Sequence, residues 1–372
     1  RQEVSATFVV RGTTGEDDPN AAHALAVSVR VVGVAPETDE GVRRETWIPL
    51  TELIVEPDEA ATAWDLFARI LTQSGYTYSL EGGVPFSITT PGGERTLAMS
   101  SSAPWRFWKF VVNGEDAKVY PDAYQVADGD VIELVYEDDS GAVLPEQDIA
   151  IDPAAPRPDW ESSWPSFTTS NKPTSSLTPI EAAEEKWVVS VGEGGSQAPG
   201  ISDPILAGDC LYIASNDKLL MKDPATGETV REAQLLVPID STSRMVYAEG
   251  LIVVPLGGGR LQALTADALT TVWVTQPVTS ASGDSRPQQS LGTLTVRDGY
   301  VYTGTTDGSY DGSGSGYLMC VNLQTGAVRW QHEAKGGYYW AGACAFGDYL
   351  VVGDDAGLVY AFDPATGETV GT

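Results

Sequence analysis

The pattern of apolar and polar positions predicts an α+β sheet in the first third of the chain. Residues 5–10 and 26–32 are rich in β-branched side chains that partly alternate with polar ones, which predicts two strands. Residues 106–112, a turn at Asn113-Gly114 and residues 131–135 predict further strands. Residues 59–71 have a helical spacing of three and four, and Gly75 follows as a stop signal; the apolar face comprises Ala63, Leu66, Phe67, Ile70 and Leu71. A helix packed on one face of a sheet follows from this mixture.

From about residue 186 the chain repeats itself. KDPATGETV at 222–230 returns as FDPATGETV at 362–370, and related copies lie at 264–273 and 321–330. A glycine-led strand pair precedes each copy, at 208–215, 250–255, 299–305 and 347–353. An interval of about 40–60 residues is the size of one four-stranded propeller blade. We therefore expect four blades whose apolar faces stack.

Within each copy, the Asp/Asn residue and the Thr-Gly pair predict the turn between the third and fourth strands. Trp187, Trp273 and Trp330 are then expected in outermost strands, where they fill the space between blades.

Residues 144–185 separate the two parts. Their proline, serine and threonine content is typical of a linker, although Trp160, Trp164 and Phe167 can pack against a neighbouring domain. The expected domains are residues 1–143, a linker at 144–185 and a propeller at 186–372. Four blades leave two alternatives, a truncated ring or a compact ring in which residues 186–191 supply the outer strand of the last blade. The second is the preferred expectation.

The first domain resembles a known family. WRFWKFVVNG at 105–114 and YQVADGDVI at 124–132 are similar to the transcobalamin-like C-terminal domains, a β-grasp-like family of unknown function. The resemblance implies a surface module, and in cobalamin carriers this domain closes over the corrin. Turn chemistry explains the same residues without a ligand, so we expect no cobalamin here.

The repeats resemble pyrroloquinoline-quinone-type propeller repeats, most closely in DAGLVYAFD at 355–363. Dehydrogenases with this repeat use calcium, a catalytic aspartate and usually adjacent cysteines. Cys210, Cys320 and Cys344 are not adjacent, and the blades are too few to enclose the cofactor, so we expect no quinone. The fold class expected for the whole chain is mainly β, an α+β β-grasp-like domain followed by a β-propeller of about four blades.

The charge, the cysteine content and the apolar runs of the chain limit which classes of partner it can bind. The formal charge of −30, spread over both parts, repels nucleic acid and anionic membranes. Three cysteines form no disulfide framework or zinc motif, and no apolar run is long enough to cross a bilayer. The chain opens at Arg1, which suggests a trimmed precursor.

Few residues are candidates for chemistry. His23 and His332 lie in no triad or metal motif, and no nucleophile elbow or P-loop occurs, so no catalytic residue is assigned. In a propeller, the connections into the innermost strands open at the central channel. Their aromatic, amide and basic side chains predict a binding site for a protein or a glycan or, alternatively, a plug that fills the channel. The residues concerned are Arg244, Gln288, Gln289, Tyr338, Tyr339 and Trp340. Asp307 and Asp311 are a candidate calcium site in a long hairpin, the alternative being a solvated loop without an ion.

These features favour a secreted or bacterial cell-surface protein that acts in binding, adhesion or scaffolding and not as an enzyme. The alternatives are a carbohydrate-active or redox enzyme that uses the propeller channel, and a protein-assembly scaffold of the outer-membrane-assembly propeller type.

Overall fold

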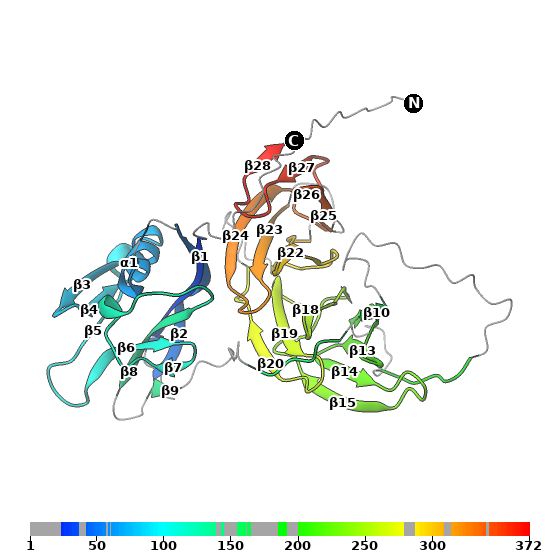
Figure 1. Cartoon of the computed structure of the whole chain (residues 1–372), viewed down its shortest axis with the longest axis horizontal. Helices are drawn as coiled ribbons and strands as arrows, with labels where there is room; N and C mark the ends of the chain where they lie inside the picture. The colour runs from blue at the N-terminus through cyan, green and yellow to red at the C-terminus, as the bar shows by residue number, and fades with distance from the viewer. Residues whose placement is uncertain are drawn as a thin grey trace, which may run out of the picture.

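A computed structural model of the chain gives the fold (Figure 1). It describes residues 24–36, 42–56, 59, 61–138, 143–144, 155–160, 162–164, 185–191, 200–278, 287–308, 314–339 and 342–372. The strand expected at residues 5–10, His23, Phe167, Asp311 and Trp340 lie outside these ranges.

The first module is a mixed sheet with one helix, as expected. Its elements are β1 (Leu25–Val34), β2 (Val42–Val55), α1 (Ala63–Gln73), β3 (Thr77–Glu81), β4 (Val84–Thr89), η1 (Pro91–Gly93), β5 (Thr96–Ala98), β6 (Arg106–Val112), β7 (Glu115–Asp116), η2 (Pro121–Ala123), β8 (Val131–Asp138) and β9 (Val143–Leu144). The main sheet has the order β2-β1-β8-β6-β7, with β1 parallel to β8 and antiparallel to β2. A separate sheet, β3-β4-β5, lies at the end of the module away from the propeller (Figure 1).

The helix begins four residues later than predicted because Thr62 caps it. Thr62 has an extended backbone, and its hydroxyl accepts from the Asp65 amide while Asp65 accepts from the Thr62 amide. This capping box satisfies two amides that have no partner inside the helix. Leu66, Phe67 and Leu71 pack into the sheet core, and the helix ends before Gly75, which has φ 77°.

Four blades follow, each with four main strands. The first has β12 (Ile205–Ala207), β13 (Cys210–Ser215), β14 (Lys218–Lys222) and β15 (Thr229–Gln234), with β10 (Ser162–Trp164), β11 (Ile201–Ser202) and β16 (Thr242–Ser243) added to its sheet. The second has β17 (Val246–Ala248), β18 (Leu251–Leu256), β19 (Arg260–Thr265) and β20 (Thr271–Val274). The third has β21 (Thr295–Arg297), β22 (Tyr300–Gly304), β23 (Ser315–Asn322) and β24 (Val328–Lys335). The fourth has β25 (Cys344–Phe346), β26 (Tyr349–Gly353), β27 (Val359–Phe362) and β28 (Thr369–Gly371).

Tryptophans join the blades as predicted. The Trp273 indole donates to the Leu323 carbonyl (2.9 Å), and the Trp330 indole donates to the Pro364 carbonyl (2.9 Å), in each case on the turn of the next blade. A Cβ added at Gly326 or Gly367 would lie within 2.7 Å or 2.5 Å of the indole, so only glycine lets the ring approach the turn.

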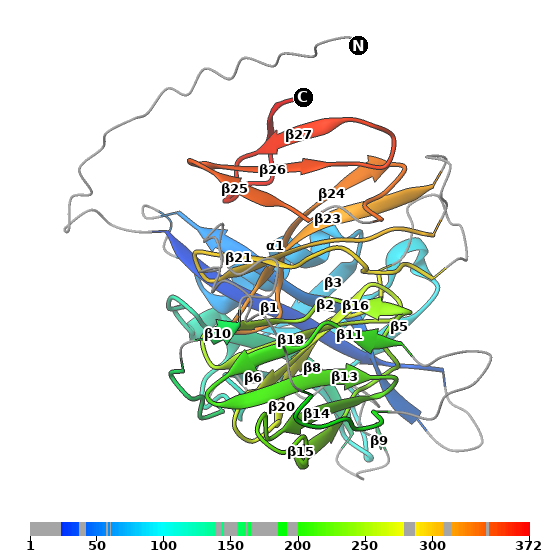
Figure 2. The ribbon, with the colours of Figure 1, turned by 90° about the vertical axis from the view of Figure 1, so that its right-hand side faces the viewer.

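The compact ring is wrong for the described residues. The fourth blade already has its own outer strand, β28, and residues 185–191 form no strand. Trp187 instead donates to the Pro224 carbonyl (3.0 Å) on the first blade. Figures 1 and 2 both show the blades as an open row with the first and fourth at opposite ends.

Part of the predicted linker packs on the propeller. β10 pairs with β12, and the Trp160 amide donates to the Tyr247 hydroxyl (3.0 Å), which in turn donates to the Trp160 carbonyl (2.6 Å). Trp160 packs against the core between the first two blades. Among the described residues, no helix combines the length and apolar character needed to span a membrane.

Candidate binding surface

The structure buries three of the five described residues that were predicted at the channel. Gln288 and Tyr338 are fully buried and Tyr339 is 8% exposed. The Gln288 amide oxygen accepts from the Thr305 hydroxyl (2.9 Å), and its amide nitrogen donates to the Ser315 carbonyl (3.4 Å). These contacts hold the strands of the third blade together and leave little of the Gln288 side chain for a ligand.

The other described channel residues also have structural contacts. Gln289 forms an isolated bridge with Thr306, and the Tyr338 amide donates to the Thr305 carbonyl (2.9 Å), which ties the fourth blade to the third. Arg244 is half-buried and pairs with Asp203 at 3.7 Å between Nε and Oδ2. That these residues contact a ligand stays a prediction.

Two buried polar atoms beside these connections lack a hydrogen-bond partner within the described structure, Asp240 Oδ2 and the Tyr338 hydroxyl. Burial raises the pKa of Asp240 to about 6, and an accepted hydrogen bond from the Ser290 amide opposes the shift. Burial, followed by the charges of Tyr360 and Asp354, also raises the pKa of Tyr338.

The residues considered for metal or redox chemistry have structural contacts in the described part of the chain. Asp307 is buried, and its Oδ2 accepts from the Ser315 amide (3.2 Å). No three His, Cys, Asp or Glu side chains within the described ranges are grouped as metal ligands. The three cysteines are free thiols, Cys210 on β13, Cys320 on β23 and Cys344 on β25. His332 packs on the rings of Tyr360 and Phe362, and burial lowers the pKa of its imidazole.

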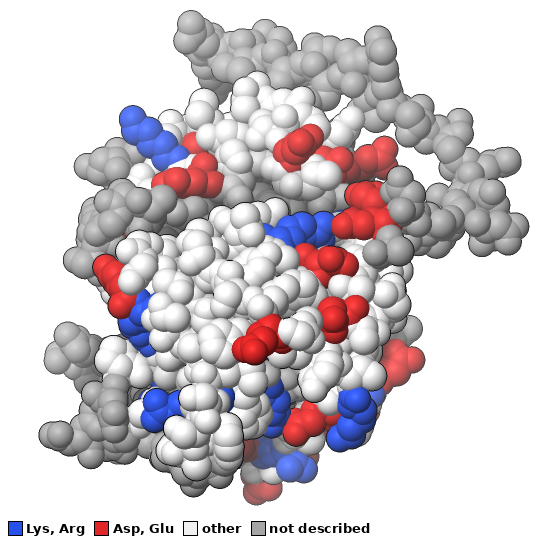
Figure 3. All heavy atoms as spheres, turned by 90° about the vertical axis from the view of Figure 1, so that its left-hand side faces the viewer, with Lys and Arg blue, Asp and Glu red and all other residues white. Residues whose placement is uncertain are grey.

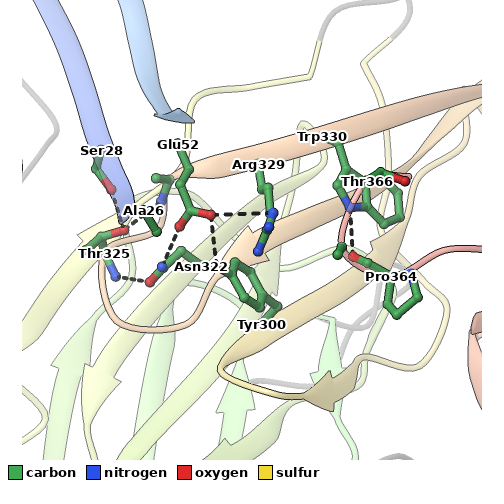
Figure 4. Close-up of polar contacts among 12 residues, drawn as sticks. Ala26, Ser28, Glu52, Tyr300, Asn322, Thr325, Arg329, Trp330, Pro364 and Thr366 are labelled. Atoms are coloured by element: carbon green, nitrogen blue, oxygen red, sulfur yellow. Dashed lines mark hydrogen bonds and ion pairs between the residues drawn. The ribbon is translucent and has the colours of Figure 1, made fainter. Parts of the chain in front are cut away.

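A buried polar network joins the module to the third blade (Figure 4). Glu52 on β2 is 4% exposed; its Oε1 accepts from the Tyr300 hydroxyl (2.8 Å), and its Oε2 accepts from Asn322 Nδ2 (2.7 Å). Arg329 Nε lies 3.7 Å from Glu52 Oε1 and supplies the compensating charge. Burial and the Glu52 carboxylate together raise the pKa of Tyr300, so the phenol stays a donor.

The same seam has backbone and hydroxyl contacts. β2 pairs in parallel with β24 at Thr51 and Val328, and Ser28 Oγ lies 3.2 Å from Thr325 Oγ1. A cavity of about 220 Å³ opens beside it, between apolar side chains and a few amides and hydroxyls; its lining includes Arg30, Leu50, Gln276, Met319, Val328 and Gln331. The seam makes one continuous ten-stranded sheet out of the module and the third blade.

The docked module presents a free strand edge on its far side. β3 pairs only with β4 among the described strands, and all five of its residues are exposed. Tyr78 and Leu80 on β3 are 36% and 44% exposed, and Phe86 on β4 is 38% exposed. Exposed edge strands are usually protected by a lysine, a proline or a covering segment. β3 contains neither lysine nor proline.

Further apolar side chains flank this edge. The Met99 amide donates to the Phe86 carbonyl (2.8 Å), which brings the loop before Trp105 (52% exposed) to β4. A Cβ at Gly83 in the hairpin turn would meet Asp122, so the segment with Tyr120 (64% exposed) lies near the turn. Figure 3 shows this end of the module as a broad uncharged area bordered by charged side chains. We call β3, β4, Trp105 and Tyr120 the hairpin surface.

Sequence reasoning missed both the seam and the hairpin surface. One signal for the seam exists: position 322 is asparagine where the first and fourth blades have Asp223 and Asp363. The hairpin surface gives no comparable signal, because exposed Tyr and Leu in a short strand read like core residues until the sheet order is known.

Three solved structures are similar to part of this chain at low sequence identity. The BamB structure from Moraxella catarrhalis is 20% identical with a TM-score of 0.36, over 44% of this chain and 48% of that one. A quinohemoprotein alcohol dehydrogenase from Pseudomonas putida HK5 is 14% identical with a TM-score of 0.38, over 46% and 33%. The designed protein Ika4 is 15% identical with a TM-score of 0.32, over 49% and 99%.

This chain thus spans about half the length of the Moraxella structure. No curated protein matches the sequence. A family match covers residues 145–339 and 315–370, more than half of the chain. The chain therefore belongs to the family described as outer membrane protein assembly factor BamB.

Proposed function

We propose that this protein is a non-catalytic scaffold that binds extended segments of partner proteins on the hairpin surface. The observation that carries the proposal is β3, an exposed edge strand with apolar and aromatic side chains. A peptide added to a free sheet edge gains main-chain hydrogen bonds, and alternate side chains set its specificity. The description of the family, an assembly factor, supports a scaffold.

The electrostatics narrow the partner class. A chain of formal charge −30 repels acidic partners, so the segment bound is apolar with neutral or basic flanks. Tyr, Trp and Phe, which β3, β4 and their flanks expose, are the side chains enriched at protein interfaces. The same proposal places the protein outside the cytoplasm, at a bacterial surface or envelope. It also takes the first module to be a transcobalamin-like domain.

The seam gives the surface a rigid support. Separation of the module from the third blade would leave the Glu52 carboxylate without its partners, and this cost favours a fixed place for β3 relative to the blades.

The test is selection of a phage-displayed random peptide library on the immobilised chain, followed by affinity measurement with one selected synthetic peptide. We expect apolar peptides, and we expect Leu80→Lys to weaken binding by about tenfold or more because edge lysines oppose strand addition. Val230→Lys is the matched control on the exposed strand β15, with 59% exposure, and should bind as the native chain does.

Two results would contradict the proposal. One is peptide binding that Leu80→Lys leaves unchanged. The other is no peptide binding together with glycan-array binding that Trp340→Ala removes, which would favour the channel instead.

A further inference from the structure

The cavity of about 220 Å³ beside the seam, which we call the seam cavity, has walls from both parts of the chain. Arg30 and Leu50 line it from the module, Gln276 from the segment after β20 of the second blade, and Met319 and Gln331 from the third blade. The walls therefore come together only when the module is docked on the blades. Pockets for small molecules are often found at such interfaces between domains.

The charge in the seam cavity is already neutralised. Among the described residues that line it, Arg30 is the only charged one. Arg30 is 7% exposed; its Nη1 lies 3.1 Å from Glu133 Oε2, and its Nη2 donates to Thr46 Oγ1 (3.1 Å), both within the module. A charged ligand would lose its water here without gaining a counter-charge, so the cavity favours a neutral molecule.

Two amide side chains in the lining keep hydrogen-bonding atoms available to a ligand. Gln331 on β24 is exposed, and its side-chain amide bonds to no described residue. Gln276 donates from Nε2 across the seam to Thr46 Oγ1 (3.4 Å), while its Oε1 accepts from no group in the described ranges. The Thr275 hydroxyl, in contrast, accepts from the Leu261 amide (2.8 Å). Because a carboxamide both donates and accepts, a second carboxamide is its complement.

The size of the seam cavity and its apolar walls limit the rest of the ligand. Leu50, Val274, Met319 and Val328 contribute apolar surface, and methionine adapts its shape to what it packs on. An engineered apolar cavity of about 150 Å³ in another protein binds benzene, so about 220 Å³ has room for roughly nine non-hydrogen atoms.

We propose that the seam cavity binds a small neutral molecule with an apolar body and one carboxamide group. The body packs on Met319 and Val328, and the carboxamide bonds to Gln276 and Gln331. Since the ligand binds only the docked arrangement, a concentration of about ten times its Kd raises the ratio of docked to undocked molecules about elevenfold. The seam cavity is separate from the hairpin surface, and its ligand goes beyond the peptide-binding function.

Benzamide is the probe, because it combines an apolar ring with a carboxamide at the size of the cavity. We expect binding with a Kd on the order of 1 mM in a titration followed by ligand-observed NMR, as befits so small a ligand. Benzoate, which has the same shape and a negative charge, should bind at least about tenfold more weakly.

Gln331→Leu tests the role of the amide. It keeps the size of the side chain and should weaken benzamide binding about fivefold, while toluene, which has no amide, should bind as it does to the native chain. Gln73→Leu, an exposed glutamine on α1, is the matched control and should leave benzamide binding unchanged. Circular dichroism should show both variants folded.

Hydrogen exchange tests the place of binding and its link to docking. Benzamide at about ten times its Kd should slow exchange that proceeds from the undocked state at residues 325–328 about elevenfold, and should leave residues 77–89 unchanged. Four results would overturn the proposal. They are no benzamide binding, as for a cavity that holds only water; equal binding of benzoate; benzamide binding that Gln331→Leu leaves intact; and protection at 77–89 with none at 325–328.

Discussion

At residue 322 an amide side chain both accepts and donates hydrogen bonds, whereas a carboxylate can only accept. Asn322 Oδ1 accepts from the Gln324 and Thr325 amides, as Asp363 Oδ1 accepts from the Ala365 and Thr366 amides in the fourth blade. Only asparagine also donates, and its Nδ2 bonds to Glu52. The first, third and fourth blades therefore share this side-chain turn contact, and the third blade alone among them uses the residue to bind the module.

Asn322→Asp is expected to destabilise the seam. It places a second carboxylate against the buried Glu52, which should cost about 2–4 kcal/mol in the free energy of unfolding. Urea unfolding and limited proteolysis at the seam measure the effect. Asp363→Asn is the matched control and should change stability by less than about 0.5 kcal/mol; equal effects of the two would argue against the network.

Asp240 predicts a pH dependence. Its folded pKa, about 6, lies above the ordinary value of 3.8, so the folded state holds the proton more tightly than the unfolded state. Stability from this group is therefore full below about pH 4 and is lost as the pH rises through 6. Asp240→Asn should stabilise the chain by about 1–2 kcal/mol at pH 7, after allowance for solvent at this half-buried site, and by little at pH 4. Unfolding curves at both pH values check this, and a gain larger at pH 4 would contradict it.

At the scale of elements, the repeats and their outer-strand tryptophans were predicted from the sequence, and the start of the helix was not. The repeat spacing placed Trp273 and Trp330 correctly in outer strands, because period and residue type together specify a blade, whereas Trp187 lies in no strand. Helix 59–71 was predicted too early because apolar spacing does not show where the backbone becomes extended, which the Thr62 cap decides.

Gly367→Ala should be more costly than Gly347→Ala. Both residues have positive φ, 73° and 57°, but only Gly367 faces an indole, and nothing lies within 4 Å of a Cβ at Gly347. We expect an excess of about 1–3 kcal/mol for Gly367→Ala. The excess should disappear when Trp330→Ala is added, as a double-mutant cycle in denaturant would measure; an excess that persists would place the strain elsewhere.

At the scale of the whole molecule, the sequence predicted two kinds of module but not how they meet. Period and pattern describe each module by itself, since each buries its own core. The seam depends on long-range contacts of Glu52 with Tyr300 and Asn322, which lie 248 and 270 positions later, and one sequence has no local signal for such contacts. The channel residues were predicted from propeller geometry, but burial of Gln288 and Tyr338 depends on neighbours that this geometry does not specify.

The most direct test of the scaffold account is hydrogen exchange with and without a selected peptide. Strand addition at β3 should slow exchange of amides in residues 77–89, because a free edge gains main-chain partners. Exchange in the channel connections at 242–245, 288–290 and 338–339 should not change. Protection of these connections with none at 77–89 would contradict the account.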